Sequence, residues 1–394
     1  MSVVNIVVIG TGMYSTGRGT NSFGTILPAI GEWKRSGANV GKVKFVGSNG
    51  NNTPAVLEKF KQFEQETGIT LGIEVFPADK RKNSTEYKTC ITDIPKPACA
   101  IVVVPDHLHY EVIKDCLLND LPVLVVKPLT PLVSEAKNLI RIANERKIYG
   151  AVEFHKRWDK ANLLIKDAIS KKRIGELLYI WVEYSQRKSI PTEIFRDWSS
   201  RSNILQYLGV HYIDIVLFYT GAKPLRVMAI GQKNWLFKQG IDTWDAIQCT
   251  IEWEIPKGAR FVQTILTNWI DPETTSAMSD QKINIIGTEG RLESNQKSRG
   301  IKIISDDKCM EEPNPDFCMS YNNENGSKEW RGYGIESVVN FLNDVSSLNQ
   351  RQTTLKSLNC TRPVFSVGLV STAVIEAAAK SLNDASSWKE ISLD

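Results

Sequence analysis

The sequence predicts an α/β protein in which a doubly wound parallel sheet precedes an α+β domain with a large, open, mostly antiparallel sheet. Three observations support this prediction. Short apolar runs alternate with amphipathic segments up to about residue 155, the pattern of parallel strands joined by helices. A glycine-rich turn follows the first run, and long, half-apolar strands replace the alternation afterwards. The length of 394 residues suits two domains.

The elements of the parallel sheet follow in order along the first third of the chain. Uninterrupted apolar runs suit strands that are buried on both faces. Pro28 should kink the first helix, and Thr53, Pro54 and Gly68 mark the start and end of the second. The expected strands are 3–10, 42–48, 99–105, 122–128 and 149–155, and the expected helices are 22–35, 53–68, 109–120 and 132–147.

After residue 155 the alternation of short apolar runs and helices gives way to long strands in which apolar and polar residues alternate. The polar stretch 306–331 is expected to be a surface loop, and we place the domain division at 1–150 and 151–394. The expected strands are 177–186, 224–234, 245–254, 260–269, 281–294 and 300–305, and the expected helices are 158–171, 334–348 and 364–383.

The bulk composition excludes several function classes. A formal net charge of +4 without a basic stripe argues against nucleic acid. No run of about 18 apolar residues occurs, so no membrane partner is expected. Seven cysteines without a CxxC pair predict neither zinc nor a disulfide framework. The start, MSVVNIVVIG, is typical of a strand rather than a signal peptide, so a cytoplasmic protein is expected.

The turn GTGMYSTGRGT at residues 10–20 is the first candidate site. It lies between a predicted strand and a predicted helix, where glycines let backbone amides approach a pyrophosphate. The first two glycines of G-x-G-x-x-G are present, but Ser15 occupies the third position. A flexible loop remains the alternative. The expected cofactor contacts here are Gly10, Gly12, Met13 and Tyr14.

The end of the second strand bears on the choice between NAD and NADP. NAD sites usually carry an acidic residue there, which binds the ribose 2′-hydroxyl. The segment VGSNGNN at 46–52 has no acid, and no arginine adjoins it in sequence. Ser48 and Asn49 suit either a hydroxyl or a 2′-phosphate. The cofactor is therefore expected to be NAD(P), with NADP slightly favoured.

Five segments in order resemble the Gfo/Idh/MocA family of NAD(P)-dependent oxidoreductases, many of which act on sugars and cyclitols. The likeness spans nearly the whole chain, so it implies a Rossmann domain followed by a substrate-binding domain. The resemblance also implies that the open sheet of the second domain makes an oligomer interface, giving a homodimer or homotetramer. The similar segments are VVVPDHLHYEVIKDCLLNDLPVLVVKPLT (102–130), AVEFHKRWD (151–159), LGVHYIDIVLFYTG (208–221), INIIGTEGRLE (283–293) and CTRPVFSVGLVSTAVIEAAAKS (360–381).

The resemblance implies roles for individual residues. Lys127 matches the lysine at which nicotinamide and substrate meet, so it would be both a catalytic and a cofactor residue. His211 matches the family's acid/base, and Asp214 a position that binds substrate or supports the histidine. The turn beside the nicotinamide is matched by Pro105 and Asp106, with His109 at the start of the following helix.

Two positions depart from the family pattern. Val126 replaces the usual Glu before Lys127, and Tyr207 stands where many members have Asp, four residues before His211. The loss of that Asp puts the acid/base pair in doubt. It also weighs against naming myo-inositol as the substrate, since that Asp is typical of the inositol enzymes.

The side chains themselves suit hydride transfer between a cofactor and an alcohol or ketone carbon. Such a reaction needs a base for the hydroxyl proton and a cation or donor for the alkoxide. His211 suits the base near neutral pH, and Lys127 suits the cation, or the base if its pKa is lowered. Tyr207 either relays a proton or packs as an aromatic residue, since it is placed one helical turn before His211.

His155 and Arg157 are further candidates for substrate contact, with packing as the alternative for both. We therefore expect a dehydrogenase of a sugar, sugar derivative or cyclitol. Two alternatives remain. One is an NAD-dependent, redox-assisted glycosidase, and the other is a dinucleotide-binding sugar sensor without turnover.

Overall fold

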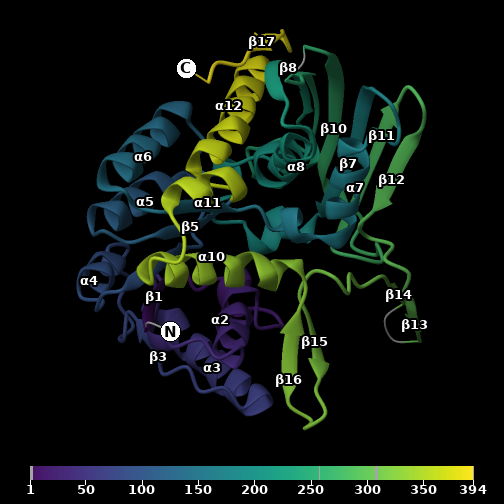
Figure 1. The fold of residues 1–394 in the computed structure, drawn as a ribbon. Helices are drawn as coiled ribbons and strands as arrows, with labels where there is room; N and C mark the ends of the chain where they lie inside the picture. Colours follow the sequence, from purple (N-terminus) through teal and green to yellow (C-terminus); the bar gives the residue numbers. More distant parts are fainter. Residues whose placement is uncertain (1–2, 257, 307–308, 394) are drawn as a thin grey trace. The chain divides into compact units, whose positions relative to one another are not determined.

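The computed structural model describes residues 3–256, 258–306 and 309–393 (Figure 1). They form two compact units. The first comprises Met1–Leu129, Ser134–Trp158 and Asp316–Gly368, and the second comprises Thr130–Val133, Asp159–Pro315 and Leu369–Asp394.

The first unit contains a six-stranded sheet in which all neighbouring strands are parallel. Its order is β3-β2-β1-β4-β5-β6, the Rossmann order, whose ligand crevice lies where the order reverses beside β1. The sequence missed β3, a strand of only four residues. The strands are β1 Val4–Ile9, β2 Val40–Val46, β3 Ile73–Phe76, β4 Ala98–Val102, β5 Val123–Val126 and β6 Gly150–Glu153.

The helices that follow these strands correct two details of the prediction. The helix expected at 22–35 begins only at Ile26, so Pro28 lies in its first turn, where a missing N–H costs no intrahelical bond and no kink is required. Thr53 is the first residue of its helix, and Asn52 precedes it as the N-cap. The helices are α1 Met13–Thr16, α2 Ile26–Arg35, α3 Thr53–Thr67, α4 Glu86–Thr92, α5 His109–Leu118 and α6 Val133–Arg146.

A late segment of the chain completes the first unit. Residues 316–368 contain the hairpin β15 Met319–Asn322 and β16 Lys328–Arg331, then α10 Tyr333–Asn349 and α11 Leu355–Thr361. α10 packs against α2 (Figure 1).

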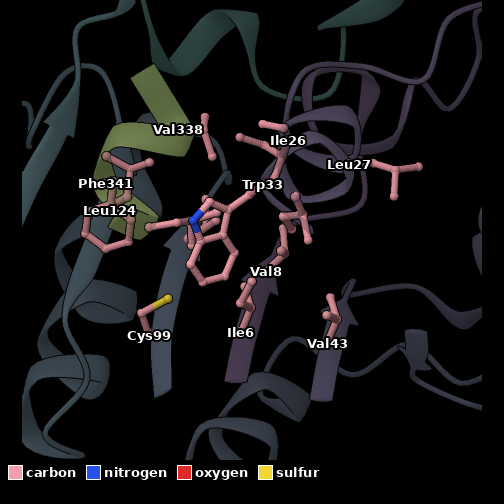
Figure 2. Close-up of a cluster of buried hydrophobic side chains, with 14 of the residues drawn as sticks. Ile6, Val8, Ile26, Leu27, Trp33, Val43, Cys99, Leu124, Val338 and Phe341 are labelled. Carbon is pink, nitrogen blue, oxygen red and sulfur yellow. The ribbon is translucent and has the colours of Figure 1, made fainter. Parts of the chain in front are cut away.

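Trp33 connects these two helices within the core. Its indole Nε1 donates to Asn343 Oδ1 of α10 at 2.8 Å. Figure 2 shows its ring among the side chains of α10 and the strands. This packing differs from two expectations: residues 316–368 join the N-terminal unit rather than the C-terminal one, and 306–331 is not all loop.

The second unit contains a seven-stranded sheet of order β12-β11-β7-β10-β9-β8-β17. Neighbours are antiparallel except β7 and β10, as the predicted mostly antiparallel sheet requires. The strand expected at 281–294 is a hairpin, because the chain turns at 288–290. The strands are β7 Leu177–Arg187, β8 Lys223–Gln232, β9 Ala246–Glu254, β10 Arg260–Asp271, β11 Ser279–Gly287, β12 Arg291–Asn295 and β17 Lys389–Glu390, with a separate pair β13 Ile303–Ser305 and β14 Cys309–Glu311.

The helices α7 Lys160–Ser170, α8 Val210–Thr220 and α9 Trp235–Lys238 lie in this unit, and α12 Phe365–Leu382 lies in it from Leu369 onward. α8 is held to the sheet by Gln263, whose Nε2 donates to the Tyr212 carbonyl at 3.0 Å. α12 is long and apolar enough to cross a membrane by composition, but 56% of it is buried within the protein. A core helix passes the same test, so this finding is weak evidence for a membrane span.

Candidate active site

The glycine turn after β1 has the backbone shape that close approach requires. Gly10 has φ of +118°, and a Cβ there would lie 2.0 Å from the Val103 carbonyl oxygen. Only glycine fits this position. Gly12 precedes α1, and a Cβ there would meet no atom within 4 Å. The backbone at Gly12 is therefore open on that side to a ligand.

The helix after this turn is interrupted. α1 ends after one turn at Gly17, which is left-handed, and the longer α2 begins at Ile26. Ser15, at the third position of the glycine motif, is fully buried, and its hydroxyl donates to the Gly12 carbonyl at 3.1 Å. Met13 and Tyr14 are half-buried in the short turn. A pyrophosphate here would therefore meet the amides of a single turn.

Ser48 and Asn49 follow β2, as predicted. The Ser48 side chain is exposed, whereas Asn49 is half-buried. The Asn49 side-chain oxygen accepts a hydrogen bond from the Asn51 amide at 3.1 Å. Asn49 therefore shapes the loop, and Ser48 presents the more accessible hydroxyl.

His109 connects the two loops that follow β4 and β5. It is fully buried at the start of α5. Its Nδ1 lies 2.8 Å from the Pro128 carbonyl, and its Nε2 lies 3.0 Å from the Val104 carbonyl. Burial lowers the pKa of this histidine. These contacts let His109 hold the two loops in place, and its predicted cofactor contact stays a prediction.

Pro105 and Asp106 lie between these two loops. Pro105 precedes the 3₁₀ turn Asp106–Leu108 and is half-buried. Asp106 is buried, and its Oδ1 accepts from the His107 amide at 2.9 Å. This places a carboxylate close enough to Lys127 to affect its titration.

Lys127 follows β5 and is half-buried. Burial lowers its pKa to about 7, although the negative charges of Asp106 and Glu153 oppose that shift. A lysine amine with such a pKa exchanges a proton near neutral pH. Lys127 therefore has the property that an acid/base in alcohol oxidation requires.

Glu153 is a site residue that the sequence reasoning missed. It ends β6, is 2% exposed, and pairs in register with Val126 of β5. Successive residues of a strand alternate between the two faces, so paired residues of parallel strands share a face. Glu153 therefore supplies a carboxylate on the face where Val126 leaves an apolar side chain. The acid in AVEFH was the only available signal.

Glu153 also organises its own neighbours. Its Oε2 lies 3.0 Å from Nδ1 of His155, and its Oε1 accepts from the Ser337 hydroxyl at 2.6 Å. With Nδ1–H donating to the carboxylate, the neutral imidazole presents Nε2 as its acceptor. His155 is 8% exposed and stacks on Tyr333, with ring centroids 5.6 Å apart. The pair is a second acid/base candidate in the first unit.

Tyr14 connects the glycine turn with this pair. Its hydroxyl lies 3.4 Å from His155 Nδ1. Burial, followed by the charge of Glu153, raises the pKa of Tyr14 well above its ordinary value. The phenol therefore stays protonated as a donor. Arg157 lies in the following 3₁₀ turn His155–Trp158 and is half-buried.

The second unit carries the other predicted catalytic residues, His211 and Tyr207, and the predicted substrate-binding residue Asp214. His211 and Asp214 lie on α8 and are 3% and 2% exposed. A spacing of three residues places both on one face of the helix. The ring of His211 lies 6.3 Å from that of Tyr184 on β7, measured between centroids.

Tyr207 does not continue this α-helical face. Leu205–Gly209 forms a π-helical turn. The expectation that Tyr207 lies one α-helical turn before His211 is therefore wrong. Its ring packs among Phe195, Trp198 and Trp269, with centroids 5.0 to 5.8 Å away. Packing accounts for the ring, and a catalytic role of its hydroxyl stays a prediction.

The structure thus brings Lys127, Asp106, His109 and the Glu153–His155 pair together in the first unit, and His211 with Asp214 in the second. Over the described ranges, no group of three or more His, Cys, Asp or Glu side chains is placed to hold a metal ion.

The fold and the glycine turn are those of a dinucleotide-binding protein of the Rossmann type, and comparison with known families adds the class of enzyme. Residues 4–154 match the oxidoreductase family with an NAD-binding Rossmann fold, and residues 163–293 match the GFO/IDH/MocA C-terminal domain. The chain belongs to the Gfo/Idh/MocA family of oxidoreductases.

Curated relatives are distant in sequence. The NADP(+) scyllo-inositol 2-dehydrogenase IolW of Bacillus subtilis is 30% identical over 135 residues, which cover 33% of this chain and 37% of that protein. The inositol 2-dehydrogenase of Rhizobium meliloti is 22% identical over 76% of this chain and 84% of the relative. Several alignments, including that with IolW, span about a third of the relative's length.

Solved structures agree over the full length of the chain. GenD2 from gentamicin A biosynthesis, in complex with NAD, has a TM-score of 0.70 at 16% identity, with 100% of this chain and 97% of that chain covered. The scyllo-inositol dehydrogenase of Lactobacillus casei with NAD(H) and scyllo-inositol has a TM-score of 0.66 at 14% identity, with 99% of each chain covered. These similarities establish the fold.

Proposed function

We propose that this protein is an NAD(P)-dependent dehydrogenase that acts on the CH–OH carbon of a cyclitol, sugar or sugar derivative. The observation that carries the proposal is Lys127, a lysine beside two buried carboxylates with a pKa of about 7. A structural lysine rarely lies in such an environment, because burial of its cation is costly. A proton-transferring lysine benefits from it.

The residues around the glycine turn fit a dinucleotide. Gly10 permits the tight turn, and the open side of Gly12 leaves room for a phosphate against the backbone amides. When bound, the nicotinamide would accept or donate the hydride. Gly12, Met13 and Tyr14 would hold the pyrophosphate side, and Pro105, Asp106 and Lys127 would line the nicotinamide side.

Side chains of the protein must accept or donate the proton of the substrate hydroxyl. We propose that Lys127 and His211 are the acid/base residues, each suited either to remove a proton or to stabilise the charge that develops on oxygen. Asp214 would hold the His211 ring or bind a neighbouring hydroxyl. The hydroxyl of Tyr207 would donate a hydrogen bond to the substrate or relay a proton, while its ring packs among aromatic side chains.

A polyhydroxylated substrate suits the polar residues that remain. His155, oriented by Glu153, and Arg157 would bind further hydroxyls. The names of IolW, the Rhizobium meliloti enzyme and the Lactobacillus casei enzyme all refer to inositols, which supports this substrate class. The proposal includes a cytoplasmic location and a homodimer or homotetramer.

The test is a panel of cyclitols, sugars, amino sugars and sugar phosphates, followed at 340 nm with NAD⁺ and with NADP⁺. Lys127→Met and His211→Asn should each lose at least about 100-fold in kcat while still binding the dinucleotide. Lys61→Met, an exposed lysine of α3, is the matched control. Full activity in both site variants would refute the assignment. Turnover of a glycoside without added cofactor would favour the redox-assisted glycosidase.

A further inference from the structure

The loop after β3 lies against the end of β2, which the sequence did not show. The Gly50 amide donates to the Arg81 carbonyl at 2.8 Å, and the Asn83 amide donates to the Ser48 carbonyl at 2.9 Å. Asn49 and Lys82 form an antiparallel bridge between these two bonds. Residues 81–83 are therefore fixed beside 48–50 by backbone contacts.

Gly50 makes this approach possible. It is buried, and a Cβ at this position would lie 1.7 Å from the Asp79 carbonyl oxygen. Only glycine allows the two loops to come so close. Because the contact is made by backbone atoms, it does not depend on the flexible side chains that project from the loop.

The loop brings a cluster of positive charge to the end of β2. Lys80, Arg81 and Lys82 are all exposed. Asp79 is the one acid within 79–83, and its carboxylate pairs with Arg81 Nε at 2.6 Å, with both side chains more than half exposed. An ion pair so exposed is weak, so a doubly charged anion can compete for the guanidinium.

The position of this cluster suggests its ligand. In a sheet of this order, the end of β2 lies at the ribose of the adenosine half of a dinucleotide. No carboxylate follows β2 between residues 47 and 52, so Asp79, which is paired with Arg81, is the acid that a phosphate would have to displace. The exposed Ser48 hydroxyl adds a hydrogen-bond donor.

We propose that Ser48, Arg81 and Lys82 form a subsite for a phosphate monoester on the 2′ position of the cofactor ribose, so that the enzyme uses NADP(H) in preference to NAD(H). The inference rests on the proposed dehydrogenase function. The cations come from the loop after β3 rather than from the residues next to Ser48.

The experiment measures dissociation constants for NADPH and NADH by titration of cofactor fluorescence. The wild type should bind NADPH at least tenfold more tightly. Arg81→Ala combined with Lys82→Ala should weaken NADPH binding by roughly 10- to 100-fold, the usual effect of losing hydrogen bonds to a charged group. NADH binding should change less than threefold. Lys61→Ala is the control for loss of an exposed positive charge.

A complementary variant tests the other side of the choice. Ser48→Asp places a carboxylate beside the ribose, so it should weaken NADPH binding at least tenfold while NADH binding is kept or improved. Tighter binding of NADH by the wild type, or an unchanged NADPH affinity in the double variant, would overturn the subsite but leave the dehydrogenase in place. Failure to bind either dinucleotide would overturn both proposals.

Discussion

Replacing Lys127 by methionine should make the protein more stable while it removes activity. Methionine keeps the length and apolar stem of the lysine but carries no charge. In the folded protein, burial lowers the pKa of Lys127 from 10.5 to about 7. Unfolding restores the ordinary pKa of the lysine. The Lys127 amine therefore binds its proton more tightly in the unfolded chain than in the folded chain.

The sign and size of the effect follow from this difference in pKa. Below about pH 7 both states are protonated, and the folded state is penalised by about 5 kcal/mol, at 1.36 kcal/mol for each pKa unit. Between pH 7 and pH 10.5 the penalty falls as pH rises, to about 2 kcal/mol at pH 9. Lys127→Met should therefore gain up to about 5 kcal/mol at pH 6 but only about 2 kcal/mol at pH 9.

The assay is urea unfolding of the wild type and Lys127→Met at pH 6 and pH 9, followed by circular dichroism. The signature is the decrease of the stability difference with pH, since any packing effect of methionine is the same at both. Lys61→Met should change the free energy of unfolding by less than about 0.5 kcal/mol at either pH. A difference between wild type and Lys127→Met that does not vary with pH would refute the reasoning.

Two further predictions concern the first unit. Glu153→Gln removes a charge that raises the pKa of Lys127, so the inflection of kcat near pH 7 should move to lower pH. An unmoved inflection, with the fold intact by circular dichroism, would show that Glu153 does not act on Lys127. Gly10→Ala should destabilise the fold by more than about 2 kcal/mol, because its Cβ would lie 2.0 Å from the Val103 carbonyl. Gly12→Ala, which meets no atom within 4 Å, should melt like the wild type but bind the dinucleotide more weakly. Equal melting temperatures for the two alanine variants would contradict the assigned roles.

The sequence by itself determined the class of fold and the type of chemistry. Short, largely apolar runs such as Val4–Ile9 suit a strand that is buried on both faces by helices, and their alternation with helical segments predicted the doubly wound sheet. Lys127 was identifiable because a lysine at the end of a buried strand is unusual. The spacing of His211 and Asp214 likewise indicated one helix face.

The tertiary structure decided what depends on contacts between residues distant in sequence. Residues 316–368 join the first unit because Trp33 bonds to Asn343 and shares its core. Glu153 comes near Lys127 only through the pairing of β5 with β6, and residues 81–83 lie beside 48–50 only through backbone contacts such as that of Gly50 with Arg81. The periodicity of apolar residues indicates which face of a helix or strand a residue occupies, but it does not indicate which residues of other elements lie beside it. Hence the sequence determined the kinds of residue at the site, whereas packing set their charges and partners.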